Sequence, residues 1–131
     1  MGKIQELEKL KKLFENVNIH PDLLMDLHEL VIGTGFEKDF FYLLTSKLNI
    51  LCQLKHDATY RTDFEKLDGA PGLYSIKLKS SRFNIRIIYS YIKNGEILLH
   101  GFYERKGKRK TEYQSHIQIS QQRFKGLKGS E

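Results

Sequence analysis

The chain has 131 residues, 40% of them hydrophobic and 11% aromatic, which excludes a disordered protein and suits a single hydrophobic core. It contains no apolar run long enough to span a bilayer, its start is unlike a secretion signal, and its single cysteine excludes an internal disulfide, so we expect a cytoplasmic protein. Residues 1–65 hold 8 Lys+Arg against 11 Asp+Glu, whereas residues 66–131 hold 14 against 5. This basic second half favours a polyanionic partner.

Apolar residues recur at helical spacing in three segments of the first half. The spacing predicts helices over about residues 4–17, over Pro21–Val31 and over about residues 37–56. Cys52 lies beside the apolar stripe of the third helix and is expected in the core. We interpret residues 1–35 as a helical extension and residues 36–131 as the main domain, within one compact unit.

The periodicity changes to two after Gly72. Alternation predicts strands at residues 72–78, 82–92 and 96–103, followed by a basic loop and a helix from Thr111. Asn94-Gly95 is a strong hairpin signal, since both residues tolerate positive φ. We therefore predict an α+β fold, in which N-terminal helices pack on one face of a small antiparallel sheet and a C-terminal helix follows.

The two predicted turns also predict strand registers. A two-residue loop at Asn94-Gly95 places Tyr89 opposite His100 and Arg86 opposite Tyr103. A two-residue loop at Ser80-Ser81 places Ser75 opposite Arg86 as well.

Alternation then divides the strand side chains between two faces of the sheet. The face expected beneath the helices collects Tyr74, Ile76, Leu78, Phe83, Ile85, Ile87, Tyr89, Tyr91, Leu98, His100 and Phe102. The opposite face, here called the cationic face, collects Ser75, Lys77, Lys79, Arg82, Arg86, Tyr103 and Arg105, with Ile88, Ile97 and Leu99 at its far end. Cations from all three strands are thus expected to converge on one surface, which favours binding of an anion.

Motifs for metal or nucleotide chemistry are absent from the sequence. The five histidines and one cysteine form no metal-ligand spacing, and there is no phosphate-binding glycine loop. We therefore expect chemistry without a metal or cofactor.

From about Phe64 to Leu127 the sequence resembles the HigB-like branch of the RelE/ParE toxins. The resemblance lies in FEKLDGAPGLYSIKL, then NIRIIY, then ILLHGF followed by a basic run and a polar helix. It implies a cytoplasmic bacterial or phage-borne toxin of a type II toxin–antitoxin system, an endoribonuclease that cleaves mRNA, usually on the ribosome. It also implies a cognate antitoxin, in this branch often a helix-turn-helix protein similar to HigA.

The resemblance also implies which residues act. The basic residue of the first motif is Lys77 and the arginine of the second is Arg86. The family prefers two lysines where this chain has Glu104 and Arg105, so Glu104 departs from the pattern. The acidic, helical first 35 residues depart from it too, because family members usually open with a short strand.

In such cleavage the nucleophile is the 2′-hydroxyl of the RNA, so the protein supplies proton transfer and charge stabilisation. We predict Lys77 as general base, Arg86 and Arg105 on the phosphate, and Tyr103 stacking on a base or positioning it. The residues expected to bind the RNA backbone are Lys79, Arg82, Lys106, Lys108, Arg109 and Lys110. Whether His116 or Tyr113 joins the site is left open.

Three alternatives accompany this hypothesis. Arg86 has a structural ion pair as its alternative role. A ParE-like gyrase inhibitor would use the same fold without cutting RNA. A non-catalytic module that binds nucleic acid or an antitoxin would use the same cationic face.

Overall fold

The computed structural model describes residues 8, 12, 14, 17–93, 95–104 and 109–129, with the backbone alone at 109–112 and 128–129. Its elements are β1 (Asn18–Ile19), α2 (Pro21–Val31), α3 (Glu37–Leu54), the short 3-10 helix η1 (Lys55–Tyr60), β2 (Phe64–Lys66), β3 (Tyr74–Lys79), β4 (Asn84–Ile92), β5 (Gly95–Tyr103) and α4 (Arg109–Gly129). The strands form one sheet in the order β1-β5-β4-β3-β2. The predicted α+β fold is confirmed, and the helix expected over residues 4–17 lies largely outside the described residues.

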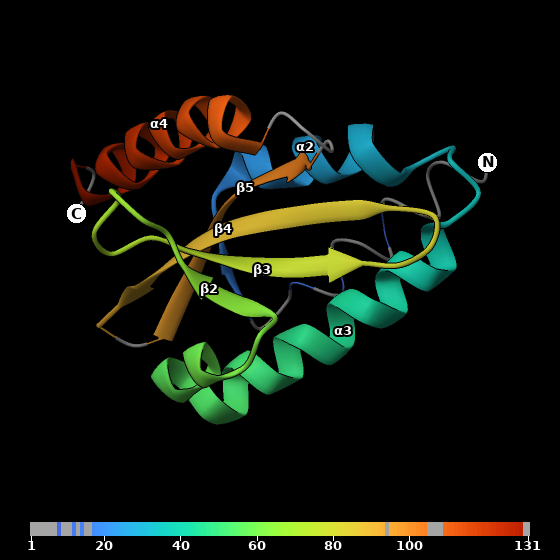
Figure 1. The fold of residues 1–131 in the computed structure, drawn as a ribbon, viewed down its shortest axis with the longest axis horizontal. Helices are drawn as coiled ribbons and strands as arrows, with labels where there is room; N and C mark the ends of the chain where they lie inside the picture. Colours follow the sequence, from blue (N-terminus) through green and yellow to red (C-terminus); the bar gives the residue numbers. More distant parts are fainter. Residues whose placement is uncertain are drawn as a thin grey trace.

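Strand pairing is antiparallel throughout the sheet except at β1, which runs parallel to β5. Figure 1 shows α3 and α4 on opposite sides of the strands. Within the described part of the chain, no helix has the length and apolar character needed to cross a membrane.

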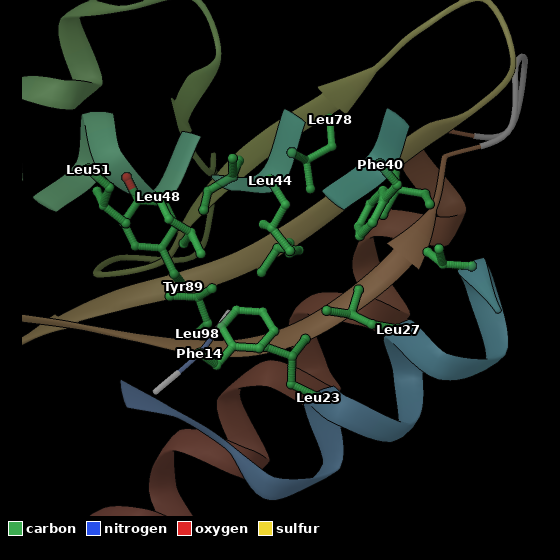
Figure 2. Close-up of a cluster of buried hydrophobic side chains, with 14 of the residues drawn as sticks. Phe14, Leu23, Leu27, Phe40, Leu44, Leu48, Leu51, Leu78, Tyr89 and Leu98 are labelled. Atoms are coloured by element: carbon green, nitrogen blue, oxygen red, sulfur yellow. The ribbon is translucent and has the colours of Figure 1, made fainter. Parts of the chain in front are cut away.

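The main core lies between α2, α3 and one face of the sheet. Leu23 and Leu27 project from α2, and Phe40 and Leu44 from α3, because apolar residues three or four apart share one side of a helix. Figure 2 shows these side chains directed toward Tyr89 and its neighbours on the strands.

Cys52 is exposed, contrary to expectation. It follows the buried Leu51, and consecutive residues of a helix point about 100° apart, so its side chain leaves the apolar stripe.

A second core lies beneath α4, on the opposite face of the sheet. The far end of that face carries Ile88, Ile97 and Leu99, as the sequence predicts, and α4 covers them with Tyr113 and Ile117. The predicted cationic face is therefore only partly open, and α4 divides it into an apolar half and a polar half.

The register between β3 and β4 differs from the prediction. Lys77, rather than Ser75, lies opposite Arg86. The connecting turn has four residues, closed by a 2.9 Å hydrogen bond from the Ser80 N–H to the Phe83 carbonyl. Arg82 consequently lies in the turn and not on a strand.

The register between β4 and β5 was also predicted wrongly. Tyr89 pairs with Leu98, two positions from its predicted partner, because the turn begins one residue earlier and Ile92 pairs with Gly95. A shift of two preserves which face each side chain occupies.

A β-bulge then reverses the faces along the rest of β5. Ile88 pairs with His100 although Tyr89 pairs with Leu98, so Leu99 is an extra residue in β5. His100 and Phe102 therefore lie on the same face as Arg86, and Tyr103, opposite Ile85, lies on the other. The faces predicted for His100, Phe102 and Tyr103 were wrong because of this bulge.

The short β1 pairs with only part of β5, and side chains bind backbone groups of β5 further along the same edge. The Gly101 N–H donates to the Asp26 carboxylate at 3.1 Å, and Arg123 Nη1 donates to the Leu99 carbonyl at 2.8 Å. Arg123 also donates to Asp26 at 2.6 Å. These contacts join α2 and α4 along one edge of the sheet.

Candidate nucleic-acid interface

Lys77 and Arg86 lie opposite each other on β3 and β4 and line one groove of about 380 Å³. The groove, here called the cationic groove, is lined by Thr59, Arg61, Thr62, Phe64, Glu65, Lys66, Lys77 and Arg86. Four of these side chains are basic and one is acidic. Such an excess of positive charge within one hollow favours an anionic ligand.

The segment between η1 and β2 supplies the part of the groove that the sequence analysis missed. Its backbone is held by hydrogen bonds from the Arg61 N–H to the Ala58 carbonyl, at 2.9 Å, and from the Lys77 N–H to the Asp63 carbonyl, at 2.8 Å. Lys47 of α3 binds the Asp63 carboxylate at 2.5 Å in a partly buried ion pair. Arg61 is therefore presented from an anchored backbone.

Arg86 forms an ion pair with Glu104, the residue that departs from the family pattern. The two side chains are only 7% and 8% exposed. The backbone beside the pair is fixed by a 2.8 Å hydrogen bond from the Glu104 N–H to the Asn84 carbonyl. The alternative role predicted for Arg86, a structural ion pair, is thus present, and it offsets the charge of Arg86 within the groove.

The other predicted site residues are distributed more widely. Lys79 is exposed at the end of β3, on the same face as Lys77. Arg82 instead binds Asp39 of α3 at 2.5 Å. Tyr103 is 39% exposed but lies on the face opposite the groove. Arg105, Lys106 and Lys108 lie outside the described residues, as do the side chains of Arg109 and Lys110.

A second groove adjoins the first. This α4 groove has a volume of about 590 Å³ and is lined by Glu65, Lys66, Leu67, Asp68, Tyr113, Gln114 and Ile117. Glu65 and Lys66 line both grooves, so the two hollows meet at β2. Tyr113, whose role the sequence left open, thus belongs to the wall of this second groove.

A series of polar contacts links α4, β5 and α2. His100 Nε2 lies 2.6 Å from His116 Nδ1, and His100 Nδ1 lies 3.1 Å from the Asp26 carboxylate. A contact this short between two ring nitrogens requires that one donates and the other accepts. These contacts connect α4 with β5 and α2, and none of the three residues lines either groove.

The pKa of Asp26 reflects this cluster. Burial by itself raises the pKa of a carboxyl, but hydrogen bonds from His100, Arg123 and the Gly101 N–H outweigh burial and lower the pKa of Asp26 below its ordinary value. Asp26 is therefore held as a carboxylate at the meeting point of α2, β5 and α4.

Within the described residues, no three His, Cys, Asp or Glu side chains are grouped to hold a metal ion. Comparison with protein-family models, curated proteins and solved structures finds no match to the chain.

Proposed function

We propose that the chain is a metal-independent endoribonuclease that acts as the toxin of a type II toxin–antitoxin pair and binds mRNA in the cationic groove. The observation that carries this proposal is the meeting of Lys77 with Arg61, Lys66 and Arg86 around one hollow. Thr62 lines the same hollow, and its hydroxyl suits a phosphate oxygen, whereas the Thr59 hydroxyl, also in the lining, donates to the His56 carbonyl at 2.8 Å.

In the proposed reaction the substrate supplies its own nucleophile. Lys77 takes the proton of the 2′-hydroxyl, whose oxygen attacks the neighbouring phosphorus while the bond to the 5′-oxygen breaks. Arg61 and Lys66, both exposed, bind the phosphate and stabilise its added negative charge. The 5′-oxygen takes a proton from water, Lys77 returns its proton to the solvent, and the products are a 2′,3′-cyclic phosphate and a 5′-hydroxyl.

The partners follow from the same proposal. The mRNA is cut on the ribosome, and a cognate antitoxin of the helix-turn-helix class neutralises the toxin. Because the groove is cationic, an antitoxin that blocks it directly would present acidic side chains there.

The test is cleavage of a labelled mRNA by the purified chain, with and without ribosomes and in the presence of a chelator. We expect fragments with 5′-hydroxyl ends from the wild type, and a rate lowered at least about 100-fold by Lys77→Ala. Lys93→Ala, which removes an exposed lysine from the β4–β5 turn, is the matched control and should cleave normally.

One observation favours a second candidate, a module that binds nucleic acid without cutting it. Glu104 offsets the charge of Arg86, so the groove has less positive charge with which to stabilise the additional negative charge of a transition state. Tight RNA binding with no cleavage under any of these conditions would select this candidate. Intact transcripts together with blocked gyrase would select the ParE-like alternative.

A further inference from the structure

The two grooves that meet at β2 differ in chemistry. The cationic groove is lined by four basic side chains and one carboxylate, whereas the α4 groove is lined by the carboxylates of Glu65 and Asp68, a single lysine, the amide of Gln114 and an apolar wall. Phosphate is repelled where carboxylates outnumber cations, so the α4 groove does not suit a second phosphate.

The apolar wall of the α4 groove is firmly supported. Tyr113 is 8% exposed, and its ring meets Phe102 edge to face with centroids 5.1 Å apart. Ile117 packs against the same cluster of side chains beneath α4. An apolar wall that is fixed in place suits a flat aromatic ligand, and unpaired nucleobases are bound by such surfaces.

The polar residues at the opening of this groove restrict which base fits. Asp68 and Gln114 are both exposed, from a turn and from α4 respectively. A carboxylate only accepts hydrogen bonds, and the Gln114 amide both donates and accepts. Together they match a base edge that carries an exocyclic amino group. At the position where cytosine carries its amino group, uracil presents a carbonyl oxygen, which a carboxylate repels.

We propose that the α4 groove binds the nucleobase next to the phosphate held in the cationic groove, and that Asp68 and Gln114 select an amino-bearing base over uracil. The inference rests on the proposed function, since it assumes single-stranded RNA as the ligand. The distance is suitable, because β2 has three residues and is therefore roughly 10 Å long, so the two grooves lie within a nucleotide or two of each other.

The experiment compares oligocytidylate with oligouridylate, whose bases differ at position 4, which carries an amino group in cytosine and a carbonyl oxygen in uracil, and at N3, which accepts a hydrogen bond in cytosine and donates one in uracil. Both carry 2′-O-methyl groups, so that neither can be cleaved, and binding is followed by fluorescence anisotropy.

We expect the wild type to bind oligocytidylate about 10-fold more tightly. The double variant Asp68→Asn, Gln114→Ala should lose this preference, while Gln122→Ala, an exposed glutamine of α4 outside the groove, should keep it.

The outcomes separate this inference from the proposed function. Equal, salt-dependent binding of both oligonucleotides by the wild type would overturn the base selection and leave the phosphate groove in place. A preference that survives in the double variant would place the selection elsewhere and also overturn it. Failure to bind either oligonucleotide would overturn both proposals.

Discussion

Arg86 and Glu104 form an ion pair in which both side chains are more than nine-tenths buried. The pair joins the first part of β4 to the residue that follows β5, and Arg86 lines the groove to which we assign RNA binding. Removing one partner of such a pair leaves an uncompensated buried charge, which costs more than the pair itself contributes.

Glu104→Gln should therefore lower the free energy of unfolding by about 3 kcal/mol, since the Arg86 guanidinium would stay buried without a carboxylate. Urea unfolding measures the change, with Glu29→Gln on the exposed side of α2 as the control. The double variant Arg86→Met, Glu104→Leu should recover most of the loss, because it removes both charges. A double variant as unstable as Glu104→Gln would contradict this account.

RNA affinity should fall steeply as salt rises, because cations of the groove displace counterions from the RNA backbone. Arg61→Ala and Lys66→Ala should each reduce the slope of log affinity against log salt by about 0.7, the value for one phosphate contact on a single strand. Lys125→Ala, an exposed lysine of α4 outside both grooves, should leave the slope unchanged. Identical slopes for all four proteins would show that the groove does not bind the backbone.

His100→Ala should destabilise the protein by about 1–3 kcal/mol and leave RNA cleavage intact while the chain is folded. The reason is structural, because the substitution removes one polar contact of His116 and one of Asp26. Thermal melting and single-turnover cleavage are measured on the same samples. Normal stability with no cleavage would instead identify the histidine pair as the acid–base group.

Stability should depend on Asp26 at acidic pH. Because the pKa of Asp26 is lowered in the folded state, the carboxylate contributes stability above its unfolded pKa of 3.8, and this contribution is lost as the pH falls through the folded pKa. The difference in unfolding free energy between wild type and Asp26→Asn should thus be constant near neutrality and shrink below about pH 4. Glu29→Gln serves as the control, and a difference that does not change with pH would refute the assignment.

The elements of the fold could be predicted because periodicity is a property of the sequence alone. Pro21 and Val31 bound the second helix as expected, and the alternation of β4 is evident in its sequence. The register could not be predicted, because no residue type marks the bulge at Leu99. The extra residue there places His100, Phe102 and Tyr103 on the faces opposite to those predicted.

The site was predictable in part for related reasons. Lys77 was assigned to the cationic face because it lies on a strand with clear alternation, and the structure places it in the groove opposite Arg86. Arg61 and Lys66 were missed because they belong to a turn and to a three-residue strand, which are too short to show a period. Glu104 was noticed as a departure, but its pairing with Arg86 follows only from the observed register.

The contacts of Asp26 and Arg123 along β5 also bear on the behaviour of the chain at high concentration. An edge strand with open backbone groups can recruit a strand from another molecule and begin aggregation. Here the Gly101 N–H and the Leu99 carbonyl are already engaged by side chains. Intermolecular growth of the sheet at this edge requires both Asp26 of α2 and Arg123 of α4 to be displaced first, so the resistance of the chain to aggregation there depends on how firmly both helices are held.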